Sequence, residues 1–183
     1  FVFTREPANA GDWVVNARLL GPDYLRTNSS AIEASWSSYK FDSNTQWPPT
    51  NLSYTTAWQG WMWNRRGQGF DVVTYDGDAV FPRAMPHNLS KSPEMIWIKC
   101  RTNAYNWEVW HKGLNGGTNP EDYHIKLNTD SAGSQTVDMW SSTAPNATYF
   151  FMGDHAVNAT NHSFIAMLFA SVDGISKVGY YTG

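Results

Sequence analysis

The 183-residue sequence has little charge and a single cysteine. Charged residues make up 16% of the chain and the net charge is −3, whereas ordinary globular chains are ~25% charged. Nucleic-acid-binding surfaces need clustered Lys and Arg, and Arg65-Arg66 is the one short basic cluster, so no nucleic-acid partner is predicted. The lone Cys100 excludes an internal disulfide framework, and its place in Ile96-Trp97-Ile98-Lys99-Cys100 is typical of a buried strand.

Long hydrophobic runs are missing as well. The longest run, Phe164 to Ala170, has the length of a strand, far below the ~18 apolar residues that indicate a membrane-spanning helix. No membrane span is therefore expected. The sequence begins at Phe1 without a Met or a signal-peptide pattern, which leads us to expect a processed or cut piece of a longer chain.

Catalytic and cofactor-binding motifs are also missing. The five His residues have no metal-ligand spacing, so no metal site is predicted. Neither a G-x-S-x-G elbow nor a Gly-rich phosphate loop occurs. Acids such as Glu94 and Glu108 could supply a carboxylate pair for glycoside hydrolysis, but no such pair recurs between the two halves of the chain. We expect no enzyme activity and no cofactor, and keep a fibre-borne depolymerase as a third alternative.

Aromatic residues are abundant, at 15% of the chain, and ten of them are Trp. With 42% hydrophobic residues the chain has enough apolar side chains to fold, which excludes a disordered protein. Asn, Ser, Thr and Gly supply most of the remaining polarity. This profile predicts an all-β extracellular or virion-surface protein.

An internal repeat organises the sequence. Blocks of the N-terminal part recur in the same order in the C-terminal part, at an offset that grows from 94 to 106 residues. The matched blocks are 1–5 with 95–99, Trp13 with Trp107, 25–29 with 125–129, Trp36 with Trp140, 57–63 with 163–169, and 72–77 with 178–183.

The repeat predicts the domain organisation. Residues 1–69 are expected to be the C-terminal portion of a first β-sandwich repeat, 70–172 a complete second repeat, and 173–183 the opening strand of a following one. The first repeat then lacks its opening strand. We expect this strand to come either from preceding residues of a longer chain or from a neighbouring copy.

Short strands, rich in β-branched and aromatic residues, fill the complete repeat. They are expected at 70–75, 95–100, 107–111, 123–128, 136–140, 149–152 and 164–170. The pattern predicts tandem antiparallel β-sandwich units, jelly-roll or lectin-like, of about 100 residues each. Strands 95–100 and 164–170 are apolar on both alternating sets, so we expect them to be central and covered on both faces, partly by a neighbouring unit or chain.

The aromatic residues divide into two groups. Four Trp residues recur in register and are predicted to pack in the core: Trp13, Trp36, Trp107 and Trp140. Trp110, whose counterpart is Asn16, is predicted to present its face at the surface beside His111 and Asn106, where a sugar ring could stack. An assembly interface is predicted at Trp58, Trp61, Trp63, Tyr180 and Tyr181.

Several blocks resemble a repeat domain of marine bacteriophage tail-fibre and virion proteins. They are Gly69–Gly77, Pro86–Leu89, Ser92–Lys99, Asn106–Leu114, Asn128–Gly133 and Lys177–Gly183. The biochemical function of that family is undefined, so the resemblance implies a lectin-like β-sandwich and a virion or adhesion context rather than a reaction.

The expected function is therefore that of a structural virion-surface or tail-fibre protein, located at the virion surface or outside the cell. Its partners would be copies of itself and other virion proteins. The alternative is a carbohydrate-binding adhesin module that attaches to host-surface glycans.

Overall fold

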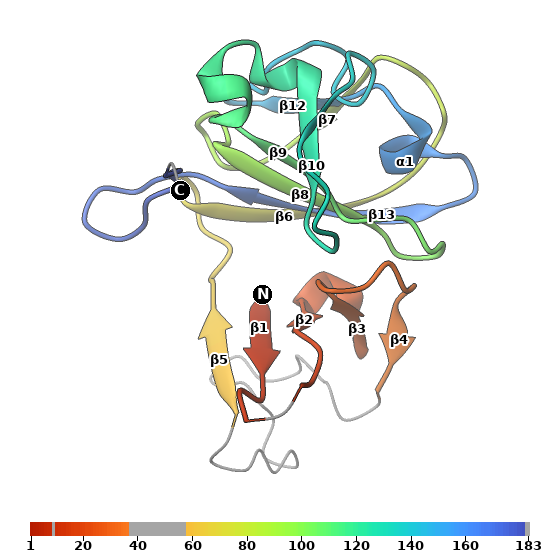
Figure 1. Ribbon diagram of the computed structural model, residues 1–183, viewed down its shortest axis with the longest axis vertical. Coiled ribbons are helices and arrows are strands. Elements are labelled where there is room, and N and C mark those ends of the chain that lie inside the picture. The colour runs from red at the N-terminus through yellow and green to blue at the C-terminus, as the bar shows by residue number, and fades with distance from the viewer. Residues whose placement is uncertain (9, 37–57, 182–183) are drawn as a thin grey trace.

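The computed structural model describes residues 1–8, 10–36 and 58–181 of the chain (Figure 1). Residue 57, which begins one of the aligned blocks, and residues 182 and 183, which end another, lie outside this range. The described part consists mainly of antiparallel β-sheets with one short α-helix. No helix in it is long and apolar enough to cross a membrane.

The larger sheet has six strands, and each neighbouring pair is antiparallel. β13 lies between β8 and β6, and along its length Met167 is opposite Val72 on one side and Trp97 on the other. In sheet order the strands are β11 (Ser134–Gln135), β10 (Tyr123–Lys126), β9 (Glu108–His111), β8 (Met95–Cys100), β13 (Ser163–Phe169) and β6 (Phe70–Asp76).

The smaller sheet has five strands, again antiparallel. In sheet order these are β4 (Ala34–Ser35), β3 (Asp23–Arg26), β2 (Val14–Asn16), β1 (Val2–Arg5) and β5 (Gln59–Met62). The sequence repeat aligns β3, β2, β1 and β5 with β10, β9, β8 and β13, and β4 pairs with β3 as β11 pairs with β10. The two sheets therefore have the same strand order. In the smaller sheet no described strand corresponds to β6.

The repeat extends to individual hydrogen bonds. The backbone N–H of Trp13 donates to Asn28 Oδ1 at 3.0 Å, and that of Trp107 donates to Asn128 Oδ1 at 2.9 Å. In both cases the Asn Nδ2 also donates to the side chain of the residue before the Trp. The same side-chain bridge therefore joins β2 to β3 in the smaller sheet and β9 to β10 in the larger sheet.

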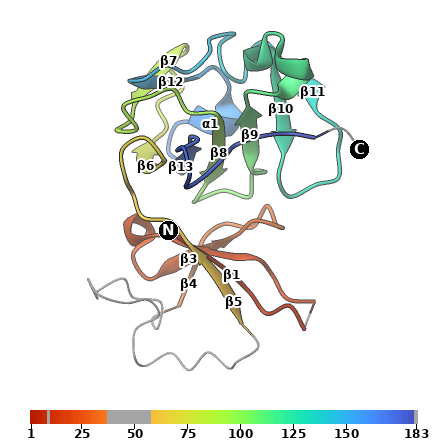
Figure 2. The same cartoon turned by 90° about the vertical axis from the view of Figure 1, so that its left-hand side faces the viewer.

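The molecule has three layers (Figures 1 and 2). The smaller sheet packs on one face of the larger sheet. The other face is covered by a two-stranded sheet of β7 (Arg83–Pro86) and β12 (Tyr149–Met152), and by α1 (His155–Asn158). Three short 3-10 helices lie in the connections: Arg18–Leu20, Leu114–Gly117 and Pro120–Asp122.

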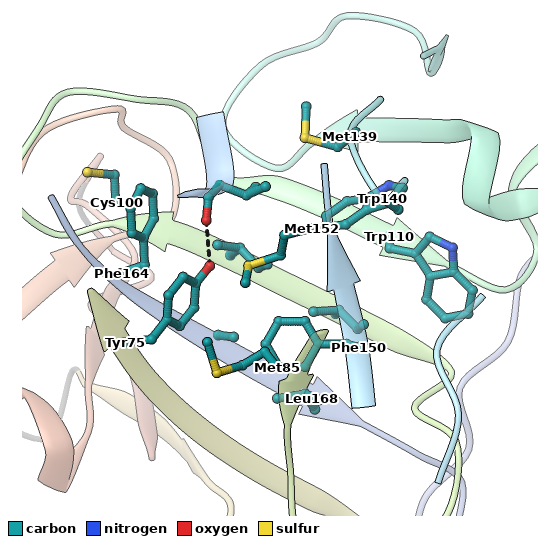
Figure 3. Close-up of a cluster of buried hydrophobic side chains, with 14 of the residues drawn as sticks. Tyr75, Met85, Cys100, Trp110, Met139, Trp140, Phe150, Met152, Phe164 and Leu168 are labelled. Carbon is teal, nitrogen blue, oxygen red and sulfur yellow. Dashed lines mark hydrogen bonds between the residues drawn. The ribbon is translucent and has the colours of Figure 1, made fainter. Parts of the chain in front are cut away.

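The first hydrophobic cluster lies between the larger sheet and the layer of β7, β12 and α1 (Figure 3). The rings of Tyr75 and Phe164 stack at 5.3 Å between centroids, and Phe150 meets the Tyr75 ring edge-on at 6.4 Å. The Tyr75 hydroxyl donates to the carbonyl oxygen of Val157 at 2.7 Å, which satisfies the one polar group that this ring brings into the cluster.

The second hydrophobic cluster lies between the two large sheets. Val15 and Leu25 of the smaller sheet pack there with residues of the larger sheet: Phe70, Val72, Trp107, Ile165, Met167 and Phe169. Along β13, even-numbered side chains enter the first cluster and odd-numbered ones the second, as strand geometry requires. The prediction that this strand is central and covered on both faces is confirmed.

The structure corrects two expectations, the strand at 136–140 and the burial of Trp36. No strand forms at 136–140, where the chain turns, so the strand at this sheet edge is β11. Trp140 is nevertheless buried as predicted, and its indole N–H donates to the carbonyl of Tyr123 at 2.9 Å. Trp107 is buried too, whereas Trp13 is half-buried and Trp36 is 48% exposed, so core packing is wrong for Trp36.

Candidate functional site: an open sheet edge and a polar pocket

The outer edge of β5 has no strand paired with it in the described part of the chain. On its inner side, Trp63 and Phe1 exchange backbone hydrogen bonds at 3.0 and 3.3 Å. Because backbone groups alternate in direction along an antiparallel strand, Trp61 also points its N–H and C=O toward β1. Those of Gly60 and Met62 therefore point outward, away from the sheet.

The larger sheet shows how the corresponding edge is filled. Ala166 and Leu168 of β13 align with Gly60 and Met62. Just beyond β13, the N–H of Ala170 donates to the carbonyl of Gly69 at 2.8 Å. Because backbone groups alternate in direction along a strand, the N–H and C=O groups of Leu168 and Ala166 also point toward β6. The outward groups of β5 are thus the counterparts of those with which β13 binds β6.

The β5 edge differs from the other three edges of the two large sheets. β4 and β11 are each only two residues long. β6 carries the exposed Asp76, a charge that discourages pairing with another chain, and the N–H of Val72 already donates to Asp71 Oδ1 at 2.9 Å. β5 has four residues, all exposed, with neither a charge nor a proline. It is the edge best suited to accept a further strand.

A groove of about 1100 Å³ opens beside the end of β5. Six Phe and Trp residues contribute to its walls, and Trp63 lies in it against Phe1 and Phe169 at ring distances of 5.3 and 6.4 Å. Trp61, which is 41% exposed, packs against Trp13 on the same sheet, with 5.6 Å between the ring centroids. Trp61 and Trp63 of the predicted interface therefore lie together at this edge, next to Trp58 in the chain.

The C-terminal segment, defined here as residues 176–181, lies on the far wall of the groove. It is not a strand in this fold, and the N–H of Val178 donates to Ser171 Oγ at 2.9 Å. Tyr180 and Tyr181 are 67% and 92% exposed. Tyr180 approaches His111 edge-on at 6.4 Å and crosses so close to Gly113 that a Cβ there would lie 2.5 Å from its ring.

A separate polar pocket of about 490 Å³ lies over β9 and β10. Glu108 Oε2 is 3.6 Å from His124 Nε2, and both residues are buried. Neither this oxygen nor His124 Nδ1 has a hydrogen-bond partner within the described residues. Residues that complete the lining include Tyr105, Asn106, Lys126, Met139 and His155.

Burial sets the ionisation of this pair. It raises the pKa of Glu108 to about 7, with Lys126 opposing the rise and Asp154 adding to it. Burial likewise lowers the pKa of His124, and Lys126 lowers it further. Near neutral pH the pocket therefore offers an imidazole and a partly protonated carboxyl group, which can both donate and accept hydrogen bonds.

The three residues predicted for sugar stacking do not form one site. Trp110 is only 4% exposed and packs in the first cluster, so the prediction that it presents its face at the surface is wrong (Figure 3). It shares the face of β9 that the layer of β7, β12 and α1 covers. His111 faces the opposite side, where its Nδ1 accepts a bond from Gly113 N at 2.9 Å. Asn106 lines the polar pocket.

Glu108 and His124 were not predicted as site residues. The signal for them was present in the repeat, since their counterparts are Val14 and Tyr24. At both positions the second repeat has a more polar residue than the first, on the buried face of a strand pair. Within the described range, no group of three or more His, Cys, Asp or Glu is placed to hold a metal ion.

One family model matches the chain. Its description is "Domain of unknown function (DUF7483)", and it matches residues 62–183. The chain belongs to this family. The DUF7483 region comprises the larger sheet, β7, β12, α1 and the C-terminal segment, while all of the smaller sheet except Met62 precedes it. No curated protein and no solved structure matches the chain.

Proposed function

We propose that the chain is a structural protein of a virion surface or tail fibre, built from tandem β-sandwich repeats and assembling through the outer edge of β5. The observation that carries this proposal is the uncharged four-residue edge of β5. With one added strand the smaller sheet acquires the six-strand order of the larger sheet, and each repeat becomes a unit of the same jelly-roll or lectin-like kind. The partners are copies of the chain and other virion proteins.

Strand addition suits the chemistry of this edge. The outward N–H and C=O groups of Gly60 and Met62 provide main-chain hydrogen bonds, which give affinity without requiring a particular side chain. The neighbouring aromatic groove supplies apolar area, and aromatic residues are enriched in protein interfaces. No reaction is assigned to the chain in this proposal.

A proline at Met62 tests the edge directly. Met62→Pro removes an outward N–H without removing a bond to β1, and proline is tolerated on an edge strand. In analytical ultracentrifugation we expect the wild-type chain to associate as its concentration rises and Met62→Pro to stay monomeric. Met62→Thr, which keeps the N–H, should associate like the wild type.

Two results would contradict the assembly function: a wild-type chain that stays monomeric at every concentration, or a folded Met62→Pro chain that associates unchanged. Thermal unfolding of all three chains provides the folding control.

Carbohydrate binding, in an adhesin for host-surface glycans, is the second candidate function. It rests on the polar pocket, in which the unpaired Glu108 and His124 atoms could bond to the hydroxyl groups of one sugar ring beside Tyr105. Isothermal titration calorimetry should detect binding of a glycan to the wild-type chain and no binding of the same glycan to Glu108→Leu. Identical glycan profiles for the two chains would contradict this candidate.

A further inference from the structure

We infer that the strand added to β5 is the C-terminal segment, residues 176–181, of a second copy of this chain. The inference rests on the assembly function proposed above, and goes beyond it by naming the partner segment and its register. In Figure 2 the dark-blue segment lies along the larger sheet, above the smaller one, and within the described residues no strand pairs with the outer edge of β5.

The segment matches β6 in sequence at the alignment offset that relates β5 to β13. Val178 aligns with Val72 and Tyr181 with Tyr75. In the larger sheet, Val72 packs in the second cluster and Tyr75 in the first. The C-terminal segment therefore has an apolar counterpart of one β6 residue on each face of the strand, Val178 on one and Tyr181 on the other.

The register follows from the observed pairing of β13 with β6. There Met167 is opposite Val72 and Leu168 is opposite Asp71. Transferred to β5, this register places Trp61 opposite Val178. By the same rule Met62 lies opposite Lys177, and Gly60 opposite Gly179.

The resulting cross-strand pairs are favourable. Trp61 beside Val178 is an aromatic and β-branched pair, a combination that stabilises antiparallel strands. Trp58 would face Tyr181 as Phe164 faces Tyr75, whose rings stack at 5.3 Å. Lys177 would lie beside the exposed Met62, where its ammonium group remains in water.

Releasing the segment from its own fold breaks the hydrogen bond of Val178 to Ser171 and the contact of half-buried Val178 with the second cluster. Tyr180 and Tyr181 are mostly exposed, so their release uncovers little further apolar surface. Pairing with β5 replaces these contacts with main-chain hydrogen bonds and with the pairs described above.

Donor and acceptor lie at different places on each copy, so this contact is heterologous. A heterologous contact repeats from copy to copy and yields either a closed ring or an open filament. An open filament is the geometry that a fibre needs.

Cysteine cross-linking tests the register. A Met62→Cys chain is mixed with a Lys177→Cys chain and oxidised, so that a mixed disulfide can form only between copies. Residues opposite each other at a hydrogen-bonded pair have Cα atoms ~5.5 Å apart, which is within disulfide range. The matched control mixes Met62→Cys with Val178→Cys, whose side chain is on the other face of the added strand. Cys100 is fully buried and remains in all chains.

We expect the mixed disulfide dimer to form at least tenfold faster with Lys177→Cys than with Val178→Cys. Equal rates, or no mixed dimer, would overturn the assigned register.

A proline variant separates this inference from the proposed function. In the β6 register Gly179 points its N–H toward β5, and nothing lies within 4 Å of a Cβ at this position. Gly179→Pro should therefore prevent association while Gly179→Ala preserves it. If Met62→Pro prevents association and Gly179→Pro does not, the assembly function stands and the C-terminal segment is not the donor. If the wild-type chain does not associate at all, the assembly function itself has failed.

Discussion

Glu108 differs in polarity from its counterpart in the other repeat. A buried apolar residue, Val14, occupies the equivalent place on β2, whereas Glu108 brings a carboxyl group into the buried face of β9. One pKa unit corresponds to about 1.4 kcal/mol. Raising the pKa from 4.5 to about 7 therefore means that ionising Glu108 costs the folded state roughly 3 kcal/mol.

This cost predicts that replacing Glu108 increases the free energy of unfolding, by an amount that depends on pH. Because the folded pKa lies above the unfolded one, the folded state binds more protons between them, and stability falls as the pH rises from 4.5 to about 7. Glu108→Gln should be about 1–3 kcal/mol more stable than the wild type at pH 8, with this difference reduced at pH 5. Urea unfolding at both pH values measures it.

His87 and His111 do not obscure that comparison. Burial lowers the pKa of both residues, and neither lines the polar pocket, so their protonation destabilises both chains alike as the pH falls. A stability difference that does not change with pH would show that Glu108 titrates normally.

At the scale of elements, Trp107 connects the two sheets. It lies just before β9 and is fully buried in the second cluster. Its indole N–H donates to the carbonyl of Arg26, at the end of β3, at 2.8 Å. Trp140 makes a similar bond to Tyr123, but within the DUF7483 region. The two Trp residues therefore stabilise different interfaces.

Trp107→Phe should loosen the contact between the sheets. The variant loses the bond to Arg26, whose carbonyl keeps only the longer bond from Ser29 N at 3.4 Å, and leaves a cavity where part of the ring was. We expect this to cost about 2–3 kcal/mol. Hydrogen exchange should rise first in β2 and β3. Trp140→Phe is the matched control, and its effect should centre on β10. Indistinguishable exchange patterns for the two variants would contradict this assignment.

At the scale of the whole molecule, the two repeats share a core. Phe3 and its counterpart Trp97 both pack against the second cluster, as do Trp63 and its counterpart Phe169. The sheets thus meet through equivalent faces. The family model begins at Met62, yet in this chain the smaller sheet covers one whole face of the DUF7483 region.

A fragment of residues 62–183 should therefore expose apolar surface. Removing the smaller sheet uncovers large side chains of the second cluster, among them Phe70, Trp107 and Met167. We expect the fragment to bind a hydrophobic dye more strongly than the full chain and to unfold at a lower temperature. Equal dye binding and equal stability would show that the region is independent of residues 1–36.

The sequence by itself determined much of the sheet architecture. Alternation and turn residues are local properties, so β8, β12 and β13 were located from the residues alone. The repeat then predicted which strands correspond, because segments with similar sequences in the same order form strands that pair in the same order. β7 was missed because its strand ends in Pro86, and α1 because four residues are too few for a helical period.

Only the tertiary structure decided which side chains are covered. Trp110 and Trp36 were assigned to the surface and to the core, and both assignments reverse in the fold. The Glu108 and His124 pair likewise forms only when β9 and β10 lie side by side. Alternation tells which residues share a face of a strand. What covers that face depends on layers that are distant in the chain, and burial, with the pKa values and open edges that follow from it, is a property of the packed layers.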